Sequence, residues 1–282
     1  MNEALRLENV NKQYQNFALQ NVNLTLPAGS IMGFIGENGA GKSTTMKALL
    51  GLIHCDSGSV YVNGNSFTGK ETDIKEQIGV VMDTSCFPEE LSAKDVGTVM
   101  SHTYKSWDDK AFQKYLTDFR IEPGKKIKNY SRGMKMKLSM AVALSHDAKI
   151  LILDEATSGL DPLVRDSMLD LFLDFIQDES HSILISSHIL SDLEKICDYI
   201  TFIHDGRILF SKSKDELLEQ YRVVKGSKEQ MRNLDKEKVI GMKENAFGAE
   251  ALVDADAIPN GMVSDPAGIE EIMLYFVRRE QS

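Results

Sequence analysis

An eight-residue segment rich in glycine restricts the folds that this chain can adopt. Residues 36–43 read GENGAGKS, a full match to the pattern G-x-x-x-x-G-K-[ST]. The segment follows the apolar run 31–35 and precedes a helix predicted for residues 42–50. In such a setting the glycines let backbone N–H groups turn inward around an anion, and the helix N-terminus adds a partial positive charge. The chain is therefore expected to hold phosphate groups on an α/β scaffold.

The loop also assigns roles to individual side chains. Lys42 would supply a cation to the β- and γ-phosphates of a nucleotide, and the Ser43 hydroxyl would be a ligand for Mg²⁺. A chance match in a glycine-containing turn would occur roughly once in a hundred chains of this length. The residues expected to contact the nucleotide are Gly36, Glu37, Asn38, Gly39, Ala40, Gly41, Lys42, Ser43 and Thr44.

A second nucleotide element is a buried strand that ends in two acids. Residues 150–153 read ILIL and lead into Asp154 and Glu155. A carboxylate at this end of a strand faces the crevice where α/β sheets bind ligands. We expect Asp154 to hold Mg²⁺ through water and Glu155 to polarise the attacking water. A helix N-cap is the alternative for such an acidic pair, and the phosphate loop favours the catalytic interpretation.

Charge and cysteine usage narrow the class of partner. The chain carries 42 acidic and 32 basic residues, a formal net charge of −10, which argues against a nucleic-acid partner. Cys55, Cys86 and Cys197 form no CxxC pair, so neither a disulfide framework nor a zinc site is expected. The charged N-terminus does not resemble a signal peptide, and the uncharged stretch 13–36 is too polar for a membrane span. A cytosolic protein is expected, with any membrane role supplied by a partner.

The hydrophobic pattern changes several times along the chain. Residues 1–80 are rich in strand signals, residues 84–146 follow a helical period, and strands alternate with amphipathic helices from 150 to 203. This alternation predicts a mainly parallel sheet covered by helices. We expect an α/β fold with an antiparallel β subdomain, a helical subdomain at about 84–148 within a domain spanning 1–215, and a small α/β appendage at 216–282. The appendage should contain a helix before Tyr221, a strand at 222–224, further strands within 239–253 and a closing helix at 269–278.

Several motifs in order make residues 5–218 resemble the ATP-binding-cassette (ABC) ATPases. Residues 130–134, YSRGM, stand where the family has LSGGQ, with only Ser131 and Gly133 matching strictly. Residues 158–161, SGLD, resemble the D-loop, which joins the two sites of a dimer; a turn before the next helix is the alternative. His188, after the run ILISS, matches the histidine that contacts the γ-phosphate, and Tyr14 lies where an aromatic ring stacks on adenine. A packed strand tyrosine is the alternative for Tyr14.

Two positions depart from the family pattern. Asp83 stands where the family usually has a glutamine after a strand, and Ala156 replaces a common proline. The Asp83 carboxylate could approach Mg²⁺ or could cap its own loop, and the sequence leaves both open. Neither change removes a chemical group that hydrolysis needs.

The resemblance implies a P-loop NTPase cassette that hydrolyses ATP with Mg²⁺, using Lys42, Glu155 and His188. It also implies that Ser131 and Gly133 act in trans, so a second cassette is required, as homodimer or heterodimer. A separate transmembrane permease subunit would hold the chain at the inner face of the cell membrane. Coupling to that subunit is expected through residues 83–94, where Phe87 and Leu91 could offer apolar contacts or could simply pack in the core.

Softer features narrow the resemblance to bacterial exporters of the bacitracin, lantibiotic and multidrug type. They are the segment 106–108, the divergent YSRGMK and the block around His188. Trp107 has a simpler explanation as a core or surface anchor. The alternatives are an importer cassette, a DNA-maintenance or translation ATPase, and a binding module without chemistry. The single phosphate loop and the acidic charge argue against the second class, and the intact catalytic residues argue against the third.

Overall fold

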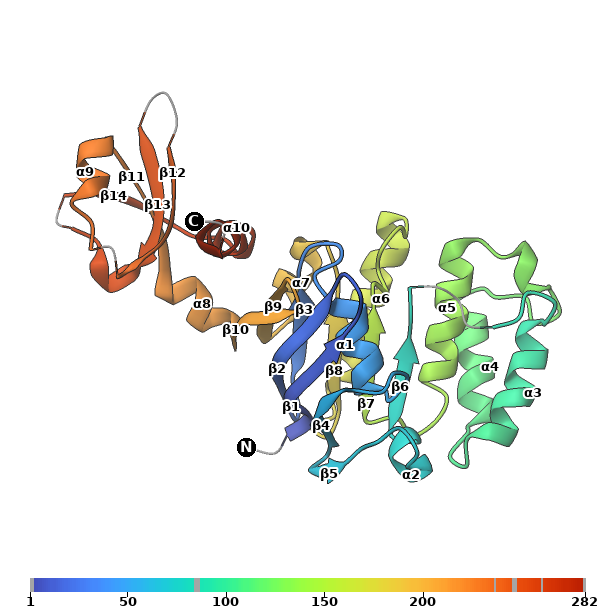
Figure 1. Cartoon of the computed structure of the whole chain (residues 1–282). Helices are drawn as coiled ribbons and strands as arrows, with labels where there is room; N and C mark the ends of the chain where they lie inside the picture. The colour runs from blue at the N-terminus through green and yellow to red at the C-terminus, as the bar shows by residue number, and fades with distance from the viewer. Residues whose placement is uncertain (1–2, 84–86, 236, 245–247, 260, 281–282) are drawn as a thin grey trace.

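A six-stranded sheet forms the centre of the molecule (Figure 1). The computed structural model describes residues 3–83, 87–235, 237–244, 248–259 and 261–280. Strands β9, β3, β8, β7 and β6 run parallel, and β10 pairs antiparallel at one edge, in the order β10-β9-β3-β8-β7-β6. The bounds are β3 (Ile31–Ile35), β6 (Ile78–Val81), β7 (Ile150–Asp154), β8 (Ser182–Ser186), β9 (Tyr199–His204) and β10 (Arg207–Ser213).

Apolar runs explain why the central strands form. All residues of β3, β7 and β8 are buried, as expected for parallel strands covered on both faces. The predicted parallel sheet is confirmed. Strand β10 was not predicted; it follows β9 through a turn in which Asp205 (φ 44°) and Gly206 (φ 74°) both take left-handed conformations, as a tight hairpin requires.

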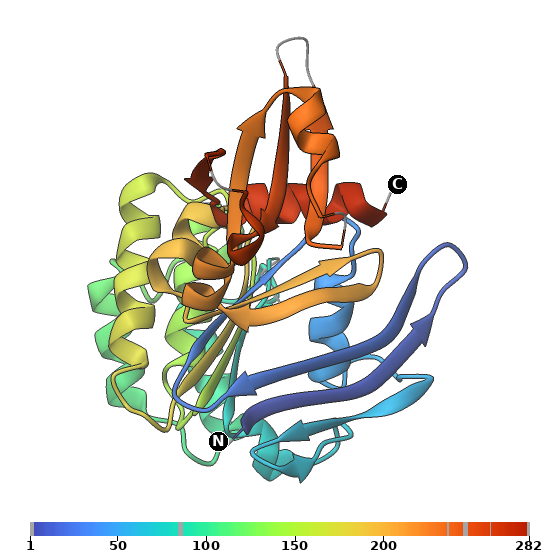
Figure 2. The same cartoon turned by 90° about the vertical axis from the view of Figure 1, so that its left-hand side faces the viewer.

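An antiparallel sheet of order β2-β1-β4-β5 lies beside the central sheet, with helix α1 (Lys42–Leu49) near both (Figure 2). Alternation along β2 gives it one buried face, with Val22, Leu24 and Leu26 in a hydrophobic cluster shared with α1. The strand-rich N-terminal part is thereby confirmed. The remaining bounds in this part are β1 (Glu3–Gln13), β2 (Ala18–Pro27), β4 (Ser57–Val62), β5 (Asn65–Ser66) and α2 (Thr72–Lys75).

The segment between β6 and β7 is helical, as predicted. It contains α3 (Ala93–Thr103), α4 (Asp109–Asp118), η1 (Ile127–Asn129) and α5 (Arg132–Ala143). These helices enclose their own hydrophobic cluster, against which Phe87, Leu91 and Trp107 pack. The start of the expected segment, Thr84–Cys86, lies outside the described residues, so the placement of Cys86 is not tested.

Two further helices follow strands β7 and β8. Helix α6 (Pro162–Phe175) comes after β7, and α7 (Leu190–Ile196) comes after β8. Asp161 caps α6 by accepting a hydrogen bond from Val164 N at 3.1 Å, and Pro162 occupies the first helical position. The D-loop candidate therefore also starts a helix, as its simpler interpretation required.

The C-terminal part is a four-stranded antiparallel sheet of order β12-β13-β11-β14. Helix α10 lies between this sheet and the rest of the molecule in both views (Figures 1 and 2). The predicted closing helix and the strands near 222 and 239–253 are confirmed, whereas α9 and β14 were not predicted. The bounds are α8 (Lys214–Gln220), β11 (Tyr221–Gly226), α9 (Lys228–Arg232), β12 (Val239–Glu244), β13 (Ala249–Asp254), η2 (Ala255–Ala257), β14 (Val263–Pro266) and α10 (Ile269–Glu280).

One hydrophobic cluster joins this C-terminal part to the central sheet. Its members run from Phe172 of α6 and Phe202 of β9 to Tyr221 of β11 and Ile272 of α10. The ring of Phe276 meets that of Phe210 edge-on at 5.0 Å. The aromatic rings of β10 and α10 are packed together, which stabilises the contact. Helix α10 therefore fixes the C-terminal sheet to the central sheet.

His146 lies buried where the helical segment returns to the sheet. Its ring stacks on Tyr104 at 4.0 Å, and its two nitrogens lie 3.3 Å from the carbonyl oxygens of Val142 and Ile78. Burial lowers the pKa of His146 below its ordinary value, against the opposing effects of these carbonyl groups and of Glu76. The neutral ring is therefore the form that the fold favours.

We expect the free energy of unfolding to fall as the pH drops below about 6.5, the ordinary histidine pKa. In that range the unfolded chain binds a proton that the folded His146 resists, so protons favour unfolding. Urea unfolding measured between pH 7 and pH 5 tests this. The pH dependence should be shallower in His146→Gln, and an identical slope in both proteins would contradict the assignment.

Candidate active site

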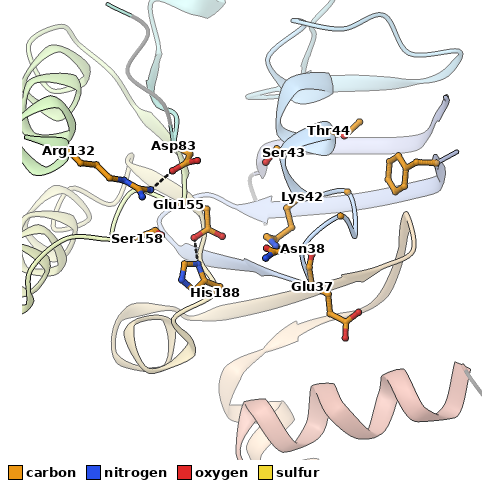
Figure 3. Close-up of a pocket in the computed structure, with 13 residues that line it drawn as sticks. Glu37, Asn38, Lys42, Ser43, Thr44, Asp83, Arg132, Glu155, Ser158 and His188 are labelled. Carbon is orange, nitrogen blue, oxygen red and sulfur yellow. Dashed lines mark hydrogen bonds and ion pairs between the residues drawn. The ribbon is translucent and has the colours of Figure 1, made fainter. Parts of the chain in front are cut away.

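A cavity of about 540 Å³ lies at the carboxyl edge of the central sheet (Figure 3). The parallel register pairs Ser186 of β8 with Phe34 of β3 on one side and with Asp154 of β7 on the other. The chain segments that leave these three strands therefore meet at one edge. The lining residues are Phe17, Glu37, Asn38, Gly39, Gly41, Lys42, Ser43, Thr44, Asp83, Arg132, Glu155, Ser158 and His188.

The predicted phosphate loop forms one wall of this cavity. Gly41 takes a φ of 114° at the N-cap of α1, and no side chain caps the helix there. The N–H groups of the first turn are thus left available to an anion. Gly36 and Ala40 are not among the lining residues: a Cβ on Gly36 would lie 2.5 Å from the Ile203 carbonyl oxygen, and Ala40 is buried.

Lys42 lies inside the loop and is buried. Its Nζ donates to the carbonyl oxygens of Gly36 at 2.7 Å and Glu37 at 3.2 Å. Burial lowers the pKa of Lys42, while the nearby carboxylates of Glu155 and Asp154 act in the opposite direction. A cation held this way by carbonyl oxygens is placed to bind phosphate oxygens instead when a nucleotide enters.

The two acids after β7 are held by a serine on the neighbouring strand. Ser186 Oγ donates to Asp154 Oδ1 at 2.6 Å and accepts from the Glu155 backbone N at 3.0 Å. Glu155 takes a φ of 54°, a left-handed conformation that is rare for a bulky residue and is typical of functional sites. Asp154 is buried, whereas Glu155 is only partly buried and reaches the cavity. The end of β7 thus places the Asp154 carboxylate in the interior and the Glu155 carboxylate at the cavity.

His188 lies directly beside Glu155 in the cavity (Figure 3). Its Nδ1 lies 2.6 Å from Glu155 Oε2. An ionised carboxylate only accepts hydrogen bonds, so Nδ1 is the donor and Nε2 is left for another partner. This contact gives Glu155, the candidate base, a fixed orientation. The structure therefore brings together Lys42, Ser43, Glu155 and His188.

Other predicted residues lie elsewhere. Tyr14 is 41% exposed and is not among the lining residues, whereas Phe17, three residues later, is. Ser131 caps α5 by accepting from Met134 N at 3.2 Å, and Gly133 follows in the first turn. Neither lines this chain's own cavity.

Asp83 reaches the cavity but already has a partner. Its Oδ1 accepts from Arg132 Nη2 at 2.5 Å. Sequence reasoning assigned no role to Arg132 or Ser186. The only signal for Ser186 was a polar residue at the end of an apolar strand, and Arg132 appeared only as a mismatch to the signature.

The fold and the cavity define a P-loop ATPase, and comparison with known proteins places it more narrowly. The ABC transporter family model matches residues 19–158. The chain is 37% identical over 216 residues to the lantibiotic transport ATP-binding protein SrtF of Streptococcus pyogenes, covering 75% of this chain and 91% of that protein. It is 32% identical over 225 residues to the bacitracin transport ATP-binding protein BcrA of Bacillus licheniformis, covering 79% and 74%.

Solved structures agree on the fold. The ATP-binding subunit of an ABC transporter superimposes with a TM-score of 0.69 at 26% identity, covering 76% of this chain and 91% of that one. A dimeric cassette bound to ADP and phosphate gives a TM-score of 0.66 at 21% identity, which supports the fold alone. The chain belongs to the ATP-binding subunits of ABC transporters. It binds and hydrolyses ATP.

We expect Glu155→Gln to lower kcat by roughly 10² to 10⁴, because a positioned proton acceptor becomes a neutral amide. ATP binding should survive, since the phosphate loop is untouched. Phosphate release and nucleotide titration measure the two effects separately. Near-normal hydrolysis in this variant would remove Glu155 from its assigned role.

Lys42→Ala should lose most of its nucleotide affinity, because a countercharge to the phosphates disappears from a buried position. Titration with a fluorescent ATP analogue measures the loss. Lys47→Ala is the matched control, since Lys47 lies on the same helix but is exposed and outside the cavity. Equal affinities in the two variants would contradict the role of Lys42.

Proposed function

We propose that this ATPase drives the export of a peptide antibiotic, drug or similar compound through a separate membrane subunit. The observation that carries the proposal is the similarity to proteins named for lantibiotic and bacitracin transport, which extends over three quarters of the chain. No helix among the described residues is long and apolar enough to cross a membrane. The similarity to these transport ATP-binding proteins supports assigning the transport path to a permease, which would hold this chain at the cytoplasmic face of the membrane.

The catalytic unit proposed is a pair of cassettes with ATP between them. Lys42, Ser43, Glu155 and His188 line the cavity of one chain, whereas Ser131 and Gly133 do not. The signature residues would complete the site of the opposite subunit. Tyr14 is proposed as an adenine contact beside Phe17, which lines the cavity.

Magnesium is the proposed metal, with Ser43 and Asp154 as its protein ligands; Asp83, the third candidate from the sequence, is paired with Arg132 instead. Within the described part of the chain, no group of three or more acidic, histidine or cysteine side chains forms a metal cluster. Mg²⁺ fits such a sparse set, since it usually takes one or two protein oxygens together with phosphates and water. Bound there, it would neutralise charge on the phosphates.

Glu155 would orient and deprotonate the attacking water, and His188 would hold Glu155 in position. The 2.6 Å contact between His188 Nδ1 and Glu155 Oε2 supports this division of roles. The Nε2 of His188 would then be available to the γ-phosphate. Positioning and electrostatics would supply most of the rate enhancement.

The division of the chain is also proposed. Residues 1–215 would form the ATPase domain, with 84–148 as its helical subdomain, and 216–282 an accessory unit. The shared cluster around Phe210 and Phe276 supports an accessory unit that is fixed to the ATPase domain and moves with it.

Purification from membranes in mild detergent tests the transport assignment. A permease with several membrane spans should co-purify with the tagged chain. Recovery of a solute-binding protein in the same complex would indicate import, and recovery of no membrane protein at all would contradict the proposal.

ATP should convert the Glu155→Gln variant from monomer to dimer, because nucleotide stays bound between the two cassettes. Light scattering with and without ATP measures the change. Adding Ser131→Arg should block it, since a bulky side chain then occupies the position facing the opposite nucleotide. A dimer that forms equally well with Ser131→Arg would contradict the role of the signature in trans.

A further inference from the structure

An ion pair at the rim of the nucleotide cavity joins two parts of the fold (Figure 3). Asp83 lies just after β6 of the central sheet, and Arg132 is the first residue of α5 in the helical segment. Arg132 Nη2 donates to Asp83 Oδ1 at 2.5 Å. The pair thus connects the sheet to the helix that begins at the signature.

The same two residues separate two cavities. Both line the nucleotide cavity, and both line a neighbouring cavity of about 460 Å³. The second cavity lies against the helical segment and is also lined by Met82, Tyr130, Lys135, Met136 and Ser139. A substitution of either residue therefore changes the lining of both cavities.

A third loop fixes the Arg132 side chain. A Cβ placed on Gly159 would lie 2.9 Å from Arg132 Nη1 and 3.2 Å from its Cζ. Gly159 has no such atom and takes a φ of 67°, so the guanidinium lies close against the backbone after β7. Arg132 is thereby placed between Asp83 and the loop that carries Ser158.

The negative charge of Asp83 explains why it is paired with Arg132. A carboxylate at the rim of a cavity that binds a nucleoside triphosphate repels the phosphates unless a nearby cation offsets the negative charge of the carboxylate. Arg132 is that cation. Both side chains are about half exposed, 50% for Arg132 and 49% for Asp83, so the pair contributes little to the stability of the fold.

We propose that Arg132 is a positioning residue for the ATPase reaction, acting through Asp83. Its guanidinium neutralises the carboxylate and directs it along the rim, and this contact holds the start of α5 beside the nucleotide. Arg132 departs from the family signature, and Asp83 departs from the family's glutamine position. The two side chains form an ion pair, so the positive charge of one offsets the negative charge of the other. The inference rests on the nucleotide site described above.

A double-mutant cycle in the full chain tests the pair. Arg132→Gln, Asp83→Asn and the double variant are compared in a Glu155→Gln background, where the Kd for Mg-ATP can be measured without hydrolysis. We expect Arg132→Gln to raise the Kd roughly tenfold at low ionic strength, because the free carboxylate then faces the phosphates. At about 1 M salt, where the screening length is near 3 Å, the effect should largely vanish.

The decisive variant is the double one. Asp83→Asn should restore the Kd of Arg132→Gln to within about threefold of the parent, since removal of the carboxylate removes the repulsion. Arg132→Lys, which keeps a cation, should retain most of the affinity. In chains that keep Glu155, kcat should be lowest for Arg132→Gln and higher for the double variant and Arg132→Lys. The thermal midpoints of all variants should stay within a few degrees of the parent's midpoint.

Lys135→Gln is the matched control. Lys135 lies one turn further along α5, pairs with Glu89 at 2.8 Å and lines only the second cavity of the two. Its Kd should match that of the parent. Additive losses in the double variant, an Arg132→Lys variant as weak as Arg132→Gln, or a salt-independent loss would each overturn the proposal. Because Kd is read without turnover, failure here is distinct from failure of the ATPase assignment.

Discussion

The parallel pairing of β3, β8 and β7 is the constraint on which the rest of the site depends. Parallel strands end at a common edge, and their buried apolar residues leave little freedom to shift the register. Ser186 lies between Phe34 and Asp154 in this register. The phosphate loop, Glu155 and His188 thus reach one cavity although they lie far apart in the sequence.

Polar contacts at that edge then set the details. Ser186 binds the Asp154 carboxylate and the Glu155 backbone together, and Glu155 keeps a left-handed conformation that few bulky residues adopt. The conformation turns the Glu155 side chain to His188 while Asp154 stays buried. Two adjacent acids can therefore have separate roles, one at depth and one toward the reacting water.

Much of this was predictable because the signals are local. The phosphate loop is contiguous, and the buried strands are short runs of apolar residues bounded by polar turns. The ion pair of Asp83 and Arg132 was not predictable, because it joins positions 49 residues apart whose contact depends on how the helical segment packs. Phe17 was missed for a different reason: two nearby aromatic residues on a hairpin are equivalent in sequence, and only the turn decides which one faces the cavity.

In the C-terminal part, too, the contact between distant segments could not be predicted from the sequence. Its closing helix was visible in the sequence as an apolar face, but the partner of that face, around Phe210, lies on a strand at the far edge of the central sheet. A helical pattern indicates that one face is buried and does not identify what covers it.

Phosphate release by the purified wild-type chain measures the ATPase reaction itself. With saturating Mg-ATP we expect steady release that requires the metal and rises more steeply than in proportion to chain concentration, since two cassettes complete each site. Tight ATP binding without phosphate release, even with the permease present, would contradict this expectation.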